Sequence, residues 1–303
     1  NVENLTLTGS GNIDATGNSL DNTLTGNSGN NTLSGESGND TAVFTGDFAD
    51  YSFTLDSTSG LIQITDSSSA RDGTDTASKI ESFSFNSQTY GLSDILNETS
   101  FDELNYIASH SDLISAFSTN TTLALNHYVN NGQSEGRAPD SFDEWSYLAS
   151  YGDLLAAFGS DTSKATQHFI NNGYAEGRSK DNFDELSYIA GYGDLINAFK
   201  NDTSAATQHY VNNGYSEGRS ADNFDVWSYM ASNTDLIRAF GSDTSSAVEH
   251  YINHGYAEDR SLDSFDASSY LSLNGDLQTA FGSDLNATTQ HYVLHGFNEG
   301  RVI

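Results

Sequence analysis

Apolar and polar residues follow three different rhythms along the chain. Up to residue 43 an apolar residue returns every nine positions, at Leu24, Leu33 and Ala42. Four short runs then alternate apolar with polar residues, at 42–46, 51–56, 61–66 and 81–92, which is typical of half-buried β-strands. From residue 101 the spacing becomes helical. The pattern predicts an α+β multidomain chain, with strands first and an all-α region after them.

The nine-residue rhythm has its own sequence signature. The blocks are "GNSLDNTLT" from Gly17, "GNSGNNTLS" from Gly26 and "GESGNDTAV" from Gly35, and each has Asn or Asp at its sixth place. These blocks resemble the RTX, or hemolysin-type, calcium-binding repeat. The resemblance implies a parallel β-roll over residues 1–43, in which calcium lies between turns 18 residues apart. The block at Gly17 would then lie over the block at Gly35.

The same resemblance implies which residues bind calcium in the roll. The ligands would be turn carbonyls and the sixth-place side chain, but only the last block has the family's Asp. Asn offers a neutral oxygen, so we expect one or two weak sites, or none in the degenerate coils. The alternative is that Gly and Asn only serve the turns. The predicted calcium site residues are Gly17, Asn22, Gly26, Asn31, Gly35, Gly38 and Asp40.

Residues 44–98 are expected to form a β-strand cap on the roll. The stretch "SSSARDGTDTASKIESFSFNSQTYGLSDIL" resembles the segment that follows the β-roll in serralysin-type secreted proteins. Its acidic residues, with Asp66 just before them, have the oxygen ligands that an ion needs. Turn chemistry explains Asp66, Asp72 and Asp75 as well, and we favour that interpretation.

The helical region consists of five copies of one 41-residue unit. The copies are 101–141, 142–182, 183–223, 224–264 and 265–303, and each starts with Phe. In copy three, Asp194 and Asp202 precede helical runs as N-caps, and Gly214 follows the last run as a C-terminal glycine. Each unit therefore predicts three short helices, and neighbouring units must stack to bury their apolar faces. The unit resembles a repeat of large bacterial extracellular proteins that carry RTX segments.

One arginine recurs in every copy of this very acidic chain. A Glu precedes it by two positions, and an Asp also recurs after each starting Phe. We expect each guanidinium to be partly buried and to bridge carboxylates of its own or a neighbouring unit, so that its loss would cost on the order of 3–5 kcal/mol. The alternative is five anion-binding sites. The residues are Arg137, Arg178, Arg219, Arg260 and Arg301.

A histidine also recurs in every copy, at His127 and every 41 residues after it. Equivalent positions in a stack lie too far apart to share a metal ion, so we expect buried histidines bonded to backbone or carboxylate. His250 with His254, and His291 with His295, have the i,i+4 spacing of a weak zinc site.

Several aromatic residues vary between copies and are candidates for sugar stacking. Interior packing is the alternative that we favour. The candidate ligand-binding residues are Trp145, Tyr151, Tyr174, Tyr192, Tyr215, Trp227 and Tyr256.

Composition narrows the partners. The net charge is −31, from 42 acidic and 11 basic residues, which excludes nucleic acid and anionic membrane surfaces as partners. No apolar run is long enough to insert into a membrane. Calcium suits so many carboxylates, and a chain without cysteine must gain rigidity from something other than disulfides. The chain does not begin with Met, and we expect a fragment or processed form with further domains upstream.

The sequence therefore predicts a non-catalytic, calcium-binding structural or adhesive segment of a secreted bacterial surface protein. The resemblance implies type I secretion, and the setting that we expect is an S-layer, a matrix or an adhesin. The helical copies would attach to envelope polysaccharide or to another copy of the chain, and the last copy would offer an open assembly face. The alternative is a carbohydrate-binding accessory region of a secreted hydrolase, lyase or protease.

Overall fold

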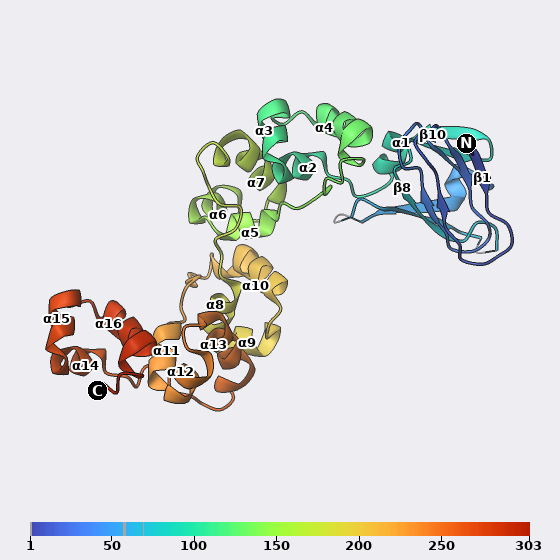
Figure 1. Cartoon of the computed structure of the whole chain (residues 1–303). Helices are drawn as coiled ribbons and strands as arrows, with labels where there is room; N and C mark the ends of the chain where they lie inside the picture. The colour runs from blue at the N-terminus through green and yellow to red at the C-terminus, as the bar shows by residue number, and fades with distance from the viewer. Residues whose placement is uncertain (1, 57–58, 69) are drawn as a thin grey trace. The chain divides into compact units, whose positions relative to one another are not determined.

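The computed structural model describes residues 2–56, 59–68 and 70–303 (Figure 1). Strands come first and helices follow, so the predicted α+β layout is confirmed. The chain divides into two compact units. One unit holds residues 1–144 and 163–180, and the other holds residues 145–162 and 181–303.

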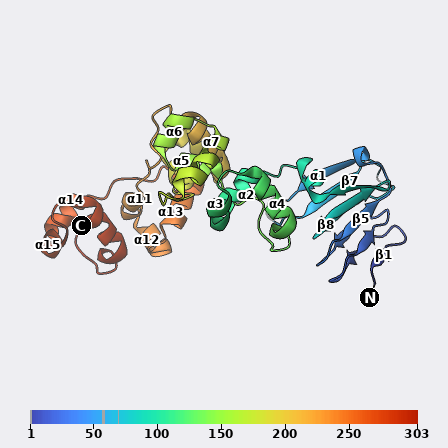
Figure 2. The same ribbon diagram turned by 90° about the horizontal axis from the view of Figure 1, so that it is seen from above.

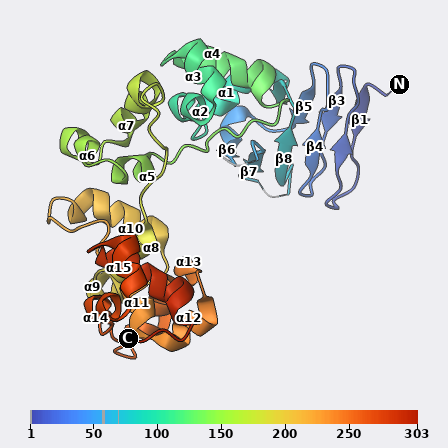
Figure 3. The same ribbon diagram turned by 60° about the vertical axis from the view of Figure 1, so that its left-hand side comes forward.

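Two five-stranded sheets form the strand-rich region of the first unit (Figure 3). One sheet has the order β1-β3-β5-β9-β10 and the other the order β2-β4-β8-β7-β6. Their bounds are β1 Asn4–Thr6, β3 Thr23–Thr25, β5 Thr41–Phe44, β9 Ser82–Phe85 and β10 Gln88–Gly91, then β2 Ala15–Thr16, β4 Thr32–Ser34, β8 Thr74–Ser78, β7 Ile62–Asp66 and β6 Tyr51–Leu55.

The nine-residue repeats stack as the sequence predicts. Leu24 pairs in parallel with Ala42, and Ala15 pairs with Leu33, so each coil advances by 18 residues. The apolar eighth places, Leu24, Leu33 and Ala42, are buried between the two sheets. One side chain per nonapeptide is therefore enough to build the core of the roll.

Residues 44–98 contain the four predicted strand runs and one strand that the sequence did not reveal. β8 pairs in parallel with β4, and β9 pairs in parallel with β5, so these strands extend the same two sheets. Figure 2 labels β5, β7 and β8 in this region. The sequence of β8, "TDTAS", has no large apolar residue, although its Asp75 and Ala77 face the interior. A short helix, α1 (Leu92–Asn97), follows β10 and was also missed.

Each 41-residue copy folds into three short helices, as predicted. None of the helices within the described ranges is long and apolar enough to cross a membrane. The helices are α2 Glu103–Ser109, α3 Ser111–Phe117 and α4 Thr121–His127; α5 Glu144–Ala149, α6 Gly152–Phe158 and α7 Thr162–His168; α8 Glu185–Ala190, α9 Gly193–Phe199 and α10 Thr203–His209; α11 Val226–Ser232, α12 Thr234–Phe240 and α13 Thr244–His250; α14 Ala267–Leu273, α15 Gly275–Phe281 and α16 Leu285–His291.

The third helix of each copy continues into one π-helical turn, in which each backbone N–H bonds five residues back. These turns are η2 Tyr128–Gly132, η3 Phe169–Gly173, η4 Tyr210–Gly214, η5 Tyr251–Gly255 and η6 Tyr292–Gly296. Gly214 is therefore the last residue of the helix, and its prediction as a glycine that follows the helix was wrong. The glycine in the left-handed conformation lies four positions later, at Gly218, with φ of 74°.

A buried tyrosine explains why the π-helical turn ends in glycine. Tyr188 of α8 is fully buried, and its hydroxyl lies so close to Gly214 that a Cβ atom would overlap it. The same hydroxyl bonds Nδ1 of His209 at 2.9 Å. The predicted backbone or carboxylate partner of the histidine was wrong. The Tyr–His pair recurs as Tyr106–His127, Tyr229–His250 and Tyr270–His291.

Aspartates cap the helices, but not all at the predicted places. Asp202 accepts the Ala205 N–H at 3.0 Å and caps α10, as predicted. Asp194 lies inside the first turn of α9, whose N-cap is Tyr192, so the predicted cap at Asp194 was wrong. The aspartates that follow the starting phenylalanines cap the first helices, as Asp102, Asp184, Asp225 and Asp266 show.

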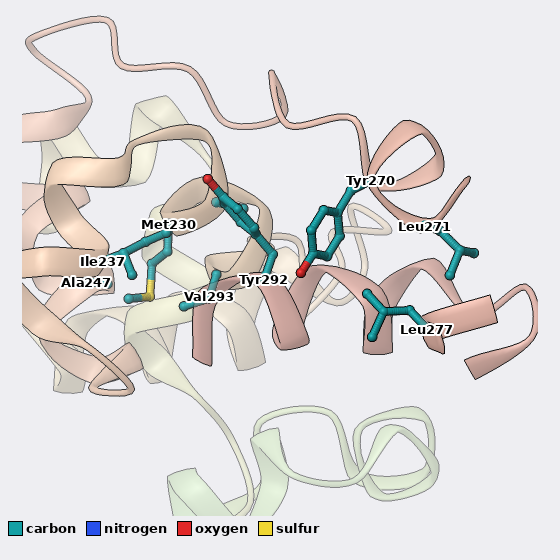
Figure 4. Packing of buried hydrophobic residues seen from close by; sticks show 9 residues of the cluster. Met230, Ile237, Ala247, Tyr270, Leu271, Leu277, Tyr292 and Val293 are labelled. Atoms are coloured by element: carbon teal, nitrogen blue, oxygen red, sulfur yellow. The ribbon is translucent and has the colours of Figure 1, made fainter. Parts of the chain in front are cut away.

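Neighbouring copies pack against each other through the same helices where the contacting segments belong to the same compact unit. The third helix of one copy packs on the first helix of the copy before it: η3 on α2, α13 and η5 on α8, and α16 and η6 on α11. Figure 4 shows the last of these contacts, where Val293 and Tyr292 of copy five meet Met230 and Ile237 of copy four in one buried cluster. The predicted stacking of neighbours is confirmed for these pairs.

The turn after each π-helical segment generates a prediction for stability. In copy three the Arg219 N–H bonds the Gly214 carbonyl and the Gly218 N–H bonds the Tyr215 carbonyl, which is a Schellman motif with Gly218 in the left-handed region. In copy four Asp259 occupies that place with φ of 54°.

Asp259→Gly should therefore stabilise the chain by about 1 kcal/mol, because glycine removes the Cβ penalty of the left-handed conformation. Urea unfolding followed by circular dichroism measures the change. The matched reverse substitution, Gly218→Asp, should destabilise by a similar amount. Equal stability of both variants and the parent chain would contradict this account of the turn.

Candidate functional site

Side-chain oxygens form a ladder along one edge of the β-roll. The Asn22 N–H donates to Asp40 Oδ1 at 2.7 Å, and the Asp40 N–H donates to Glu81 Oε2 at 2.7 Å. Asn22 Oδ1 accepts the N–H of Asn18 in its own turn at 2.6 Å. The sixth places of successive coils therefore lie directly over one another, as the 18-residue stacking requires.

A second ladder runs along the opposite edge. The Asn31 N–H donates to Asp75 Oδ1 at 2.8 Å, and Asn31 Oδ1 accepts the Asn27 N–H at 2.9 Å. Asp75 thus takes the sixth-place position of the next coil although it lies 44 residues further along the chain. The sequence interpretation of Asp75 as a turn residue missed this role. Asp75 is the second residue of β8, and the sequence gives no other sign of this strand.

The glycines that open the nonapeptides leave room for oxygen atoms. A Cβ atom on Gly17 would overlap Asn22 Oδ1 and the Gly35 carbonyl oxygen. A Cβ atom on Gly35 would overlap Asp40 Oδ2 and the Lys79 carbonyl oxygen. Gly26 is approached by Asn31 Oδ1 and Asp75 Oδ2. Gly38 has φ of 131° and lies against the Leu20 carbonyl. The predicted glycines therefore line the places where the oxygen atoms converge.

Asp40 differs from the other ladder residues because one of its oxygens has no partner. Its side chain is fully buried, and Oδ2 accepts no hydrogen bond. Burial raises the pKa of Asp40, the Asn22 N–H lowers it, and the charge of Asp21 raises it further. Burial and the charges of Asp40 and Asp21 also raise the pKa of Glu81. A buried, unpaired carboxylate beside a second one is stabilised by a cation.

Calcium fits this position better than the neighbouring ones. The ion takes oxygen ligands, both carboxylate and carbonyl. Asp40 Oδ2 and the Lys79 carbonyl oxygen both face Gly35 and supply such atoms. Asn22 and Asn31 are neutral and their side-chain oxygens already accept backbone N–H groups. Within the described ranges no three His, Asp or Glu side chains come together as a metal site, so backbone carbonyls must complete the coordination.

Asp66 and Asp72 hold the loop between β7 and β8 together. Asp66 accepts from Nε and Nη2 of Arg71 at 2.8 and 2.7 Å, and this ion pair lowers its pKa. Asp72 accepts from the Thr45 N–H at 2.8 Å and from the Tyr51 hydroxyl. The Asp66 contacts support the turn interpretation, whereas Asp72 ties the loop to Thr45 and Tyr51, which lie more than 20 positions earlier in the chain.

The recurrent arginines bridge two carboxylates within their own copy. Arg219 Nε donates to Glu217 at 2.7 Å, and its Nη atoms donate to Asp194 at 2.9–3.0 Å. Equivalent Asp partners are Asp112 for Arg137, Asp235 for Arg260 and Asp276 for Arg301. The Glu contact also holds for Arg178, with Glu176 at 2.7 Å. The geometry agrees with the prediction of partly buried, bridging guanidinium groups.

The predicted cost of losing an arginine was too high. The side chain of Arg219 is 21% exposed, but Asp194 is 61% exposed and keeps its own hydration. Arg219 lowers the pKa of Asp194. Solvent screens such a contact, so the scale for the Arg219–Asp194 pair is about 0.2–1 kcal/mol instead of the cost of stranding a buried charge.

The candidate sugar-stacking aromatics make contacts within the fold. The Tyr215 hydroxyl donates to the Gly152 carbonyl at 2.9 Å, and Tyr256 lies against Gly193, so each ties its copy to the preceding one. Tyr192 accepts the Ser220 N–H and lies under the Arg219 guanidinium at 4.9 Å. Trp227 packs against the cluster in Figure 4. Tyr151 meets Tyr147 edge-on, Trp145 is half-buried and Tyr174 is 42% exposed.

The two histidine pairs of copies four and five remain simple pairs. The ring centres of His250 and His254 lie 5.6 Å apart, and those of His291 and His295 lie 5.5 Å apart. His250 and His291 use Nδ1 for tyrosine hydroxyls. The part of the chain that the structure describes provides no third side-chain ligand for zinc at either pair.

Comparison with known protein families identifies the N-terminal repeats. Residues 16–47 match the hemolysin-type family model described as the RTX calcium-binding nonapeptide repeat, in four copies. Repeats of this type bind calcium, in agreement with the oxygen ladders. The match does not reach the serralysin-like stretch or the helical copies. No curated protein and no solved structure matches the chain.

The orphaned oxygen of Asp40 gives a prediction for calcium binding. Asp40→Asn should stabilise the β-roll in chelator, because it removes a buried charge, and should reduce its stabilisation by calcium. A free calcium concentration about a hundredfold above Kd stabilises the parent by roughly 2.7 kcal/mol. Hydrogen exchange of β3 and β5 with and without calcium measures both effects. Asp47→Asn, which removes an exposed carboxylate of the same region, is the charge-matched control. An unchanged calcium response of Asp40→Asn would rule out this site.

Asp75 gives a prediction for pH. Burial raises the pKa of Asp75 from 3.8 to about 7, and the charges of Asp72 and Asp66 add to the increase. The calcium-free folded state therefore binds a proton that the unfolded chain has already released, and stability falls as the pH rises through this window.

Asp75→Asn should reduce that fall, to which Asp40 and Glu81 also contribute because burial raises their pKa values. It should be more stable than the parent above pH 7 by at least about 1 kcal/mol. The asparagine oxygen can still accept the Asn31 N–H. Exchange protection of β4 and β8 in chelator between pH 5 and pH 8 provides the measurement. A parent protein whose protection does not decrease with pH would contradict the assignment.

Proposed function

We propose that this chain is a non-catalytic, calcium-stabilised structural segment of a secreted bacterial surface protein, whose helical copies attach it to envelope polysaccharide. RTX repeats are typical of secreted proteins, which supports the location. An S-layer, a matrix or an adhesin, reached through type I secretion, is the setting that we propose.

The observation that carries the proposal is the buried Asp40 oxygen without a partner. In the calcium-poor cytosol this carboxylate destabilises the roll, and in calcium-rich surroundings the ion stabilises it. A roll that becomes stable only outside the cell suits export of an unfolded chain. The function of the N-terminal region is then to fold after secretion and to hold the rest in place.

The helical copies support a presenting role more than a chemical one. Their recurrent polar residues are engaged with each other, as the Tyr188–His209 and Arg219–Asp194 contacts show. The hydrogen-bonding groups of these side chains are used to position helices, and we therefore propose that the helical region has no catalytic activity. The interlocked helices provide a rigid frame.

A cleft in the second unit supports polysaccharide as the partner. It has a volume of about 520 Å³ and lies between the starts of α8 and α11 and the side of α16. The partly buried Trp227 is one of the residues that line it, and Asn286 and Gln290 line it with amide groups. An aromatic face together with amides and carboxylates suits a sugar ring and its hydroxyls. The cleft would serve a carbohydrate-binding accessory region of a secreted enzyme equally well.

The charges of the cleft select among sugars. Asp184, Asp222 and Asp225 line it, so an acidic polysaccharide would be repelled and a neutral one accepted. Asp184 and Asp225 also cap their helices, which leaves Asp222 as the carboxylate that can be changed without loss of a cap.

A glycan array of neutral and acidic oligosaccharides tests the proposal. Binding should be confined to neutral glycans, and the variant Asp222→Ala/Asn286→Ala/Gln290→Ala should weaken it by about tenfold or more. Asn212→Ala, at an exposed position of copy three outside the cleft lining, should bind like the parent. Absence of any neutral glycan ligand would overturn the attachment role, while the calcium response of the roll would stand independently.

A further inference from the structure

Copy five packs into a groove of copy four, which we call the docking groove. Copy four presents Trp227, Met230, Ala231 and Ile237 from α11 and α12, and copy five covers them with the Tyr292–Phe297 segment. Met230, Ala231 and Ile237 are almost completely buried there. These groove residues are apolar, and the covering helix is favourable because it removes their surface from water.

Copy five has a groove at the same place. Its lining is Ser268, Leu271, Ser272, Gln278, Gly282, Ser283 and Leu285, and its volume is about 560 Å³. The first four of these residues stand 41 positions after the four groove residues of copy four. Copy five therefore repeats the groove of copy four in position but not in chemistry.

Three groove positions are apolar in every other copy and polar in copy five. Ser268 replaces Leu or Trp, Ser272 replaces Ala, and Gln278 replaces Ile or Leu. The corresponding residues of copies one to four are Leu104, Trp145, Leu186 and Trp227; Ala108, Ala149, Ala190 and Ala231; and Ile114, Leu155, Ile196 and Ile237.

The new polar groups are satisfied by their own copy. Gln278 Nε2 donates to the Leu271 and Ser272 carbonyls at 3.2 and 3.0 Å, at the end of α14. The Ser272 hydroxyl donates to the Ser269 carbonyl at 2.9 Å. Ser268 is exposed, and covering its hydroxyl with an apolar helix would remove it from water, at a cost of about 1–3 kcal/mol. Leu285, which replaces a threonine, keeps one apolar residue at the rim and is 46% exposed.

The opposite end of the array is also covered. The residues of copy one that correspond to Tyr292 and Phe297 are Tyr128 and Gln133. Tyr128 is fully buried, and its hydroxyl lies against Gly60, in the connection between β6 and β7 of the same unit. The strand-rich region thus occupies the surface that a preceding copy would use.

We infer that the groove of copy five is built against docking: Ser268, Ser272 and Gln278 replace its apolar lining, so the helical copies do not extend head to tail by stacking on another chain. Repeat arrays need such polar end faces to stay soluble. The inference replaces the open assembly face expected from the sequence. It is independent of the glycan cleft, which lies elsewhere on copies three to five.

The test restores the apolar groove in the full chain. Ser268→Trp/Ser272→Ala/Gln278→Ile should self-associate through paired grooves as concentration rises, whereas the parent should sediment as a single species. The control variant Ser245→Trp/Ser216→Ala/Asn212→Ile introduces the same residues at exposed positions outside the groove and should remain a monomer.

A cysteine probe reports on the groove itself. The chain has no cysteine, so Ser283→Cys introduces a unique thiol in the groove lining. Its maleimide labelling rate should be independent of concentration in the parent background and should fall about tenfold or more in the restored variant. Protection of the thiol in the parent background would show that the groove docks another molecule, and a monomeric, folded restored variant would show that the three polar residues do not close it. Either result overturns the inference.

Discussion

The helical region depends on one contact that recurs along it: a buried tyrosine hydroxyl held between a histidine and a glycine. Tyr106, Tyr188, Tyr229 and Tyr270 are fully buried, and each bonds a histidine Nδ1. The hydroxyl can sit there only because the π-helical turn ends in glycine. Burying a phenol without a partner is costly, so the histidine and the tyrosine must be kept together. This contact joins the first helix of a copy to its third, and both helices then form the surfaces that dock on neighbouring copies.

The strand-rich region follows a different principle. The core of its nonapeptide coils needs only Leu24, Leu33 and Ala42, because two sheets close over them. Larger buried rings, such as Phe83 and Phe85, fill the part formed by residues 44–98. Polar residues at the turns then form ladders in which each backbone N–H meets a side-chain oxygen of the next coil. Where the ladder carries a carboxylate, as at Asp40, burial makes the negative charge unfavourable without a cation. Calcium binding and folding are therefore coupled in the roll.

The sequence predicted much of the candidate site because repeats place equivalent residues over one another. The 18-residue stacking and the role of Asp40 in the ladder follow from the nonapeptides alone. The role of Asp75 in the ladder could not be predicted, because it lies 44 residues after Asn31 instead of the 18 residues that separate successive coils. The same limit applied to the histidines: their recurrence indicated a structural role, but a tyrosine on a different helix became a partner only after folding. The arginines were predicted correctly to bridge carboxylates. The exposure of Asp194 determines how much the ion pair contributes to stability, and the spacing of residues in the sequence does not reveal that exposure.

By itself the sequence determined the periods: nine residues for the roll, 41 for the helical copies, and the apolar positions that each period must bury. Periodicity is a local property, so it fixes the elements and their repetition. Only the tertiary structure decided which copy covers which, that Gly214 is the last residue of a helix while Gly218 shapes the turn after it, and that Ser268, Ser272 and Gln278 line one groove. These features depend on which surfaces lose water when helices from different copies meet, and that is settled by packing in three dimensions.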